Sequence, residues 1–462
     1  MSNARHIKHL YARAGFGICF EDLHANENRS VKKAVHKLFN DAEKQEPITA
    51  VTENVDLRYN PRTITDDEKR LVQAERDKQE KALNNAWVKQ MSETDAQLRE
   101  KMTLFWHNHF ACNVRNSYNE QQLNNIERVN ALGNFKTLLL QVSQSPAMLE
   151  FLNNEQNQKS HPNENFAREL MERFTMGLGH YTEEDVKESA RAFTGWWFDY
   201  QKTGEFTFKP YAHDNGVKTF LGQTGNFCGE DVIDIIIANK QTALFICTKL
   251  YRYLVNDVAD LKHVNQMADV FYSSNYEIRP VLEFVFLSDW FYDDKNIGNL
   301  IKSPVEFLVG LNRQFFINYQ NQDVLIQFQR TLGQVLFRPP NVGGWPGGTS
   351  WIDSSSLMYR MKMPSILLNV AVIDFTGKAT PEDEAYLASA QKQQLNMIKN
   401  PKALPDWDMF LQALPQNATK DEIVEFLLEP KLSKTMMEEI KTTADIKQAV
   451  IQIVSTPEYQ LC

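Results

Sequence analysis

Cysteine is scarce in this chain of 462 residues, and no two cysteines are closely spaced. They are Cys19, Cys112, Cys228, Cys247 and Cys462. Zinc ribbons and iron–sulfur sites need paired, closely spaced cysteines, and a disulfide framework needs an even set. The sequence therefore argues against all three, and we expect buried thiols in a reducing compartment.

Long apolar runs and an excess of basic residues are also missing. No stretch approaches the ~20 apolar residues that a membrane-spanning helix needs, and residues 1–17 contain no apolar core of a signal peptide. The formal net charge is −9 at pH 7, whereas nucleic-acid binders concentrate basic residues on one face. We expect no nucleic-acid partner, no membrane span and a cytoplasmic location, unless an export leader is missing from the sequence.

Helical periodicity dominates what is present. Apolar residues recur at helical spacing through most of the chain, whereas a two-residue period is clear only at 205–208 and 217–222. The sequence predicts a mainly α-helical, multi-helix globular protein with one small β-hairpin insertion at about 203–222. We expect a main helical domain over 1–370 and a C-terminal helical appendage over 371–462, where the chain turns more polar.

The stretch 163–197 is the richest in ionisable residues and in glycines at helix ends. A first helix is predicted over 163–176, ended by glycine. A second is predicted from Thr182, whose side chain forms a capping box with Asp185. The two helices form a hairpin that is either an amphipathic surface element or one wall of a polar cavity.

Composition favours the cavity over a solvated acidic face. Asn165, Glu169 and Glu172 recur at i, i+4 and i+7, so they share one face of the first helix, while Glu188 and Arg191 lie one turn apart on the second. A face kept only for solubility more often carries Lys/Glu pairs. We expect Arg191 to pair with a buried glutamate of the first helix.

Two histidines, His107 and His109, end the long charged helical pattern over 65–105. On a helix they point roughly 200° apart, so they face one metal only if the helix ends between them. Histidine near carboxylates is a signal for metal binding or for acid–base chemistry, and such ligands suit zinc, iron or manganese. We hypothesise a divalent metal, and we expect His107 and Glu169 to share a cavity; the candidate ligands are His107, His109, Glu169 and Glu172.

Two loops complete the candidate site. The tip of the predicted hairpin carries His213 and Asp214, which either form only a turn or lie over the central helices as a lid. The Gly/Pro-rich stretch 337–351 is either a rigid surface loop or an aromatic wall beside a cleft. The candidate catalytic residues are His107, His109, Glu164, Arg168, Glu169, Glu172, Glu188, Arg191, His213 and Asp214.

Several stretches together resemble the bacterial family catalogued as domain of unknown function 1800. They are HLYARAGFG (9–17), KMTLFWHNHFA (101–111), SPAMLEFL (145–152), NENFARELMERFTMGLGHYTEEDVKESARAFTGWW (163–197), FKPYAHDNGVKTFLG (208–222), KSPVEFLVG (302–310) and LGQVLFRPPNVGGWPGGTSW (332–351). The resemblance extends to about residue 370 and implies no particular activity, although relatives are often exported. Some relatives carry histidine at the position of Phe174, so no ligand role is assigned there.

Two functions remain open at this point. The first is an enzyme with a His/carboxylate site between helices, with or without a metal. The second is a non-catalytic binding or assembly protein whose buried Arg–Glu pairs fix its packing. The charged helix predicted over 65–100 is then a candidate surface for a protein partner.

Overall fold

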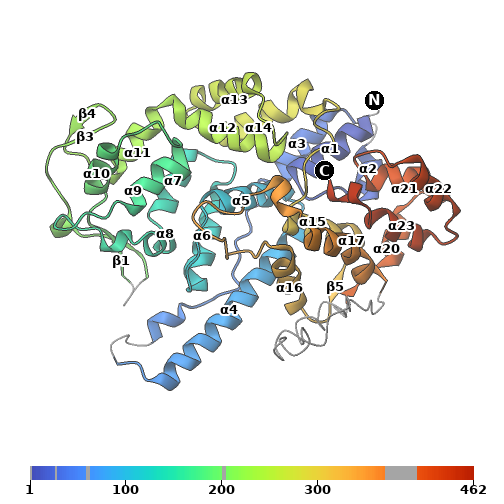
Figure 1. Ribbon diagram of the computed structural model, residues 1–462, viewed down its shortest axis with the longest axis horizontal. Helices are drawn as coiled ribbons and strands as arrows, with labels where there is room; N and C mark the ends of the chain where they lie inside the picture. The colour runs from blue at the N-terminus through green and yellow to red at the C-terminus, as the bar shows by residue number, and fades with distance from the viewer. Residues whose placement is uncertain (1–2, 27–28, 59–62, 200–203, 370–402) are drawn as a thin grey trace.

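The structure is a computed structural model that describes residues 3–26, 29–58, 63–199, 204–369 and 403–462 (Figure 1). Helices make up most of these residues, and the strands that they contain form two-stranded antiparallel pairs. The predicted mainly α-helical fold is therefore confirmed. Figure 1 places α8–α11 with β1–β4 at one end of the molecule, α1–α3 with α20–α23 at the other, and α5 and α6 between them.

The first third of the chain forms helices at both ends of the molecule and between them. They are α1 (Asn3–Ala14), α2 (Phe20–Asn26), α3 (Val31–Asp41), η1 (Val55–Arg58), α4 (Asp66–Glu93), α5 (Gln97–His109), α6 (Ser117–Asn130), α7 (Phe135–Ser143) and α8 (Pro146–Phe151). The helical pattern over 65–105 is therefore two helices, not one. Thr94 takes an extended conformation and its hydroxyl accepts a hydrogen bond from the backbone N of Ala96, which competes with helix continuation.

The central helical hairpin follows a short 3₁₀ turn, η2 (Asn154–Gln156). It consists of α9 (Asn165–Glu169), the π-helical turn η3 (Leu170–Thr175) and α10 (Glu183–Ala192). Thr182 and Asp185 form the predicted capping box at the start of α10. Gly177 follows η3 at a φ of +81°, a conformation that glycine adopts without a Cβ penalty.

The strands pair differently from the prediction. β1 (Trp196–Phe198) pairs with β2 (Phe206–Phe208), and β3 (Lys218–Phe220) pairs with β4 (Gln223–Gly225). Both predicted strand segments therefore contain strands, but the expected pairing of 205–208 with 217–222 is wrong. The chain between β2 and β3 instead forms the 3₁₀ turn η4 (Pro210–Ala212), and the residues after this turn bind α10.

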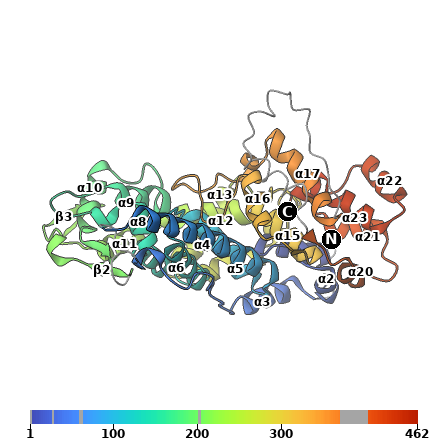
Figure 2. The same ribbon diagram turned by 90° about the horizontal axis from the view of Figure 1, so that it is seen from below.

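The remaining helices build the upper side and the C-terminal end of the molecule (Figures 1 and 2). They are α11 (Gly229–Ala238), α12 (Lys240–Leu254), α13 (Leu261–Ser273), α14 (Ile278–Leu287), η5 (Asp289–Tyr292), α15 (Pro304–Phe315), α16 (Asp323–Leu332), η6 (Gly348–Trp351), α17 (Ser354–Leu368), α20 (Trp407–Ala413), α21 (Lys420–Leu427), α22 (Lys434–Thr442), α23 (Ile446–Val454) and η7 (Pro457–Gln460). A short pair, β5 (Asn318–Tyr319) with β6 (Ala403–Leu404), joins α15 to the C-terminal helices.

Two hydrophobic clusters form the core. One joins α1, α3 and α5 to α7–α14. The other joins α4, α15–α17 and α20–α23, so the C-terminal helices pack on the rest of the chain. The domain boundary at 370 stays a prediction, and residues 371–402 of the predicted C-terminal appendage lie outside the described residues.

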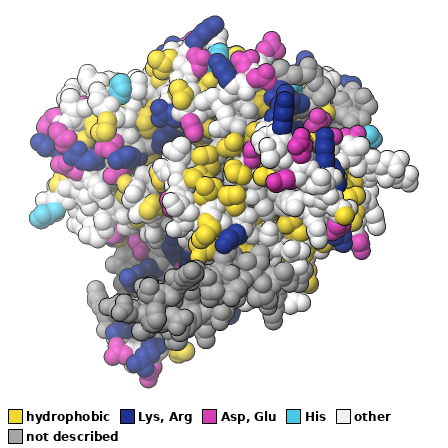
Figure 3. Space-filling view, turned by 45° about the vertical axis from the view of Figure 1, so that its right-hand side comes forward, with side chains coloured by type: hydrophobic (Ala, Val, Ile, Leu, Met, Phe, Trp, Pro, Cys, Tyr) yellow, Lys and Arg dark blue, Asp and Glu magenta, His cyan; other side chains and the backbone are white. Residues whose placement is uncertain are grey.

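The surface in Figure 3 shows Lys/Arg and Asp/Glu side chains interspersed, with hydrophobic side chains gathered near the centre of this face. Among the described helices, none is both long enough and apolar enough to span a bilayer.

Candidate functional site

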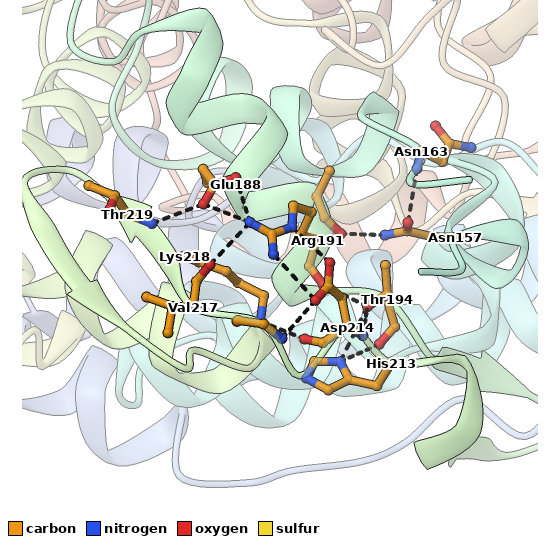
Figure 4. Close-up of polar contacts among 12 residues, drawn as sticks. Asn157, Asn163, Glu188, Arg191, Thr194, His213, Asp214, Val217, Lys218 and Thr219 are labelled. Atoms are coloured by element: carbon orange, nitrogen blue, oxygen red, sulfur yellow. Dashed lines mark hydrogen bonds and ion pairs between the residues drawn. The ribbon is translucent and has the colours of Figure 1, made fainter. Parts of the chain in front are cut away.

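Arg191, near the end of α10, is the centre of a dense polar network (Figure 4). Its guanidinium donates to Glu188 at 2.8 Å and to Asp214 at 2.7 Å, and it also donates to the carbonyl oxygen of Val217 at 3.2 Å. The hydrogen bonds to Asp214 and Glu188 raise the pKa of Arg191, and the bond from Arg191 lowers the pKa of Asp214. Arg191 thus pairs within its own helix and with the loop after β2; the expected glutamate partner from the first helix is wrong.

The loop that carries His213 is tied to the end of α10 (Figure 4). The imidazole Nδ1 of His213 donates to the carbonyl oxygen of Thr194 at 2.8 Å, and the Thr194 hydroxyl accepts from the backbone N of Asp214 at 2.8 Å. Lys218 is 1% exposed and donates to the carbonyl oxygens of Asp214 and Gly216. The polar groups of this loop and of the end of α10 form hydrogen bonds with one another, as they do in a network whose role is structural. We call the residues Glu188, Arg191, Thr194, His213, Asp214 and Lys218 the α10 network.

Arg168 forms an ion pair with Glu164 at the start of its own helix and another with Glu183 that joins α9 to α10. Arg168 donates to both carboxylate oxygens of Glu183, at 2.8 Å and 2.7 Å, and to Glu164 at 3.1 Å. The contact with Glu183 raises the pKa of Arg168. The side chain of Glu183 is 71% exposed, so this group lies at the surface of the hairpin.

Glu169 and Glu172 share one face, as the i, i+3 spacing predicts. Arg173 lies between them, 2.9 Å from Glu172 and 3.9 Å from Glu169, and the Tyr181 hydroxyl donates to Glu172 at 3.2 Å. Burial, together with the charge of Glu172, raises the pKa of Glu169. One buried carboxylate oxygen of Glu169 has no hydrogen-bond partner in the structure.

His107 and His109 point into different surroundings because α5 continues through both. The backbone N of Phe110 donates to the carbonyl oxygen of Trp106, so the helix closes only after His109. The condition under which both histidines could face one metal, a helix end between them, is not met. His107 accepts a hydrogen bond at Nε2 from the backbone N of Phe337 at 3.1 Å. Its Nδ1 lies 3.5 Å from Glu127 of α6, so the proton of a neutral imidazole lies toward this carboxylate.

His109 reaches the central hairpin instead. Its Nε2 donates to the carbonyl oxygen of Phe174 at 3.0 Å, and its Nδ1 lies 3.2 Å from the Lys249 amine. Burial and the charge of Lys249 lower the pKa of His109 well below its usual value. Burial and the neighbouring Arg173 lower the pKa of Lys249 to about 8.

The four predicted metal ligands therefore have different partners. His107 contacts Glu127, His109 contacts Phe174 and Lys249, and the two glutamates contact Arg173. Within the ranges that the structure describes, no group of three or more His, Cys, Asp or Glu side chains is arranged to hold a metal ion.

A buried polar stripe on α6 was missed by the sequence analysis. Glu120, Asn124 and Glu127 recur at i, i+4 and i+7 on one face, and each is almost completely buried. The amide atoms of Asn124 and the carboxylate oxygens of Glu127 have no hydrogen-bond partner in the structure. Burial raises the pKa of Glu127, and it raises the pKa of Glu120 to about 8 against the opposing charge of Arg338. The i, i+4 and i+7 spacing of these three residues was the feature of the sequence that could have indicated a shared polar face.

The Gly/Pro-rich loop closes over His107. Phe337 takes a φ of +67°, and the rings of Phe337 and Trp345 lie 5.0 Å and 5.8 Å from the imidazole. The backbone N of Trp345 donates to the amide oxygen of Asn108 at 2.7 Å. These contacts favour the rigid-loop interpretation for this part of the loop.

A cavity of about 640 Å³ lies at the other end of the molecule, between the α1–α2 turn, α4, α15 and the C-terminal residues. Its lining includes Gly15–Gly17, Lys101, Lys302, Glu306 and Gly310. These residues come from three of the stretches that carry the family resemblance, which the fold brings together from distant parts of the chain. The sequence analysis assigned no role to any of them.

The inner wall of this cavity holds several ionisable side chains. Lys101 pairs with Glu306, and Lys8 lies 3.9 Å from Glu429. Lys302 donates to the carbonyl oxygen of Tyr459 at 2.8 Å, and burial lowers its pKa to about 8. Burial opposes the ionisation of Glu306, but Lys101 and the cap at Ser303 together hold its pKa below the usual value.

The fold and these contacts define a mainly helical protein with a charged hairpin at one end and an ionisable cavity at the other. A family model described as "Protein of unknown function (DUF1800)" matches residues 9–461, so the chain belongs to that family. This match runs past residue 370 and includes the C-terminal helices. No curated protein and no solved structure matches the chain.

Proposed function

We propose that the protein binds a small polar molecule in the cavity of about 640 Å³ between α1, α4 and α15. One observation carries this proposal: three family stretches, 9–17, 101–111 and 302–310, all contribute to this cavity wall and place ionisable side chains there. Ligand sites in proteins typically enclose ~300–1,000 Å³ and combine apolar walls with a few polar groups. Perturbed pKa values in a cleft support such a site.

In this proposal the α10 network has a structural role. Its hydrogen bonds fasten the loop 213–219 to α10, as in the hypothesis that the Arg–Glu pairs are architectural. The catalytic roles considered for Glu188, Arg191, His213 and Asp214 are then not needed.

A cavity-filling variant tests the proposal. Gly310 lies within α15 and lines the cavity, and a Cβ there meets only the Phe16 carbonyl oxygen, at 3.4 Å. Gly310→Leu should therefore fold while occupying the cavity. Gly133→Leu is the matched control, because a Cβ at Gly133 meets only ordinary contacts and lies outside the cavity.

The measurement is a thermal-shift screen of metabolite-sized acids and carbonyl compounds against the three proteins. The proposal expects compounds that raise the melting temperature of wild type and of Gly133→Leu but not of Gly310→Leu. Stabilisation that is equal in all three proteins would place binding elsewhere and defeat the proposal.

An enzyme with a His/carboxylate site between helices is the second candidate. The observation in its favour is the buried contact between His107 and Glu127 beside the unpartnered amide of Asn124. A metal form of this enzyme, with zinc, iron or manganese, predicts stoichiometric metal in purified protein and its loss in His107→Ala and in Glu127→Ala. Wild type that stays metal-free after incubation with these ions would contradict the metal form.

The exposed half of α4 is our candidate surface for a protein partner. Its first turns carry mostly charged residues, and Leu71 there is 63% exposed.

We also propose a cytoplasmic location. Pull-down with wild type and with Leu71→Ser, and fractionation of the source cells, test these two proposals separately.

A further inference from the structure

We propose that Lys302 is a nucleophilic amine that forms a Schiff base with carbonyl compounds entering the cavity. This inference rests on the proposed function and names the class of ligand. Lys302 immediately precedes Ser303, the N-cap residue of α15, and retains some exposure where it lines the cavity.

The cations around the cavity differ in their partners. The amine of Lys101 pairs with Glu306, and that of Lys8 donates to two backbone carbonyls beside Glu429. The amine of Lys302 donates to the carbonyl oxygen of Tyr459 and lies 4.0 Å from the centroid of the Tyr459 ring. Among the residues described by the structure, no carboxylate forms an ion pair with Lys302. Among the described lysines of this inner wall, Lys302 is therefore the one whose amine forms no ion pair with a carboxylate.

The surroundings of Lys302 favour the neutral amine. Burial is the main cause of its lowered pKa of about 8, opposed by Cys462, Glu429 and Glu306 and assisted by Lys101. Arg360 approaches the same residue by donating to its backbone carbonyl. At pH 7 an amine with a pKa of about 8 is neutral roughly two hundred times more often than an ordinary lysine, and only the neutral amine is a nucleophile.

The reaction is balanced without a further reactant. The nitrogen lone pair of Lys302 forms a bond to the carbonyl carbon, and the carbonyl π electrons move to oxygen, which takes a proton. The nitrogen loses both of its protons, and the hydroxyl takes a second proton and departs as water, which leaves the imine. Both protons exchange with water, so that one amine and one carbonyl yield one imine and one water.

Reductive trapping on the full-length wild-type protein tests the inference. The probe is glyoxylate with sodium cyanoborohydride, and peptide mass spectrometry measures the labelling rate at each lysine. Lys101 is the matched control in the same cavity because Glu306 holds it, and exposed Lys89 at the rim is the reference for ordinary lysines. We expect labelling of Lys302 at pH 7 to exceed that of either control about tenfold or more.

Two further readouts distinguish this role from a structural one. The ratio of labelling at Lys302 to labelling at Lys89 should fall as pH rises above about 8, and Gly310→Leu should slow labelling of Lys302 without changing Lys89. Labelling of Lys302 no faster than Lys101 would overturn the inference. If Gly310→Leu still abolishes ligand stabilisation, only the inference fails; if that effect is absent too, the proposed function fails with it.

Discussion

Removing the guanidinium of Arg191 should destabilise the protein far more than removing a lysine on the same helix. Arg191→Ala deletes the bonds to Glu188, Asp214 and the Val217 carbonyl. Lys187→Ala deletes one contact with Glu184 at 3.4 Å, between side chains that are 57% and 70% exposed. The two substitutions therefore compare a network residue with a solvent-screened pair.

The magnitude follows from exposure. The side chain of Arg191 is 27% exposed, and its partners Glu188 and Asp214 are 13% and 20% exposed. Truncation of one partner of a fully buried pair costs ~3–5 kcal/mol, and partial solvation of the stranded carboxylates reduces that. We expect a loss of about 2–3 kcal/mol for Arg191→Ala and less than about 0.5 kcal/mol for Lys187→Ala.

Urea unfolding followed by tryptophan fluorescence measures the difference, because Trp196 and Trp197 directly follow α10. Arg191→Lys keeps the charge but loses the forked geometry, so its midpoint should fall between wild type and Arg191→Ala. Equal midpoints for Arg191→Ala and Lys187→Ala would refute the structural role of the α10 network.

Two other predictions concern the loop over His107 and the stripe on α6. Gly344→Ala should lower the free energy of unfolding by about 3 kcal/mol, because its Cβ would lie 2.2 Å from the Asn108 amide oxygen. The control Gly347→Ala has a similar φ and no atom within 4 Å, so it should lower that free energy by about 1 kcal/mol. Equal losses of stability in thermal unfolding would contradict this. Burial raises the folded pKa of Glu127, so its contribution is present below the unfolded value of about 4.3 and is lost as pH rises through the folded pKa. Wild type should therefore lose stability relative to Glu127→Gln as pH rises above about 4.3, and parallel pH profiles of the two proteins would contradict this.

Local rules carried most of the fold prediction. The predicted capping box of Thr182 and Asp185 marked a helix start that the structure contains. Strand pairing could not be predicted in the same way. Segment 206–208 pairs with the strand before it and segment 218–220 pairs with the strand after it, because side chains on α10 bind the loop between the two segments. A tertiary contact of this kind does not appear in the periodicity of the sequence.

The candidate site was harder to predict for the same reason. Arg191 and Asp214 were both candidate residues in the sequence, but only the fold shows that they bind each other. Lys101 and Lys302 lie about two hundred residues apart in the chain, so neither periodicity nor motif spacing relates them. The stripe on α6 was visible as Glu120, Asn124 and Glu127, but its burial depends on Arg338 and His107 from other elements.

Crystallographic soaking with glyoxylate tests the central claim, that the cavity between α1, α4 and α15 is a ligand site, most directly. The account predicts electron density inside the cavity, within bonding or hydrogen-bonding reach of Lys302, in wild-type crystals and none there in Gly310→Leu. Ligand density that recurs elsewhere, with the cavity holding only water in both proteins, would contradict it.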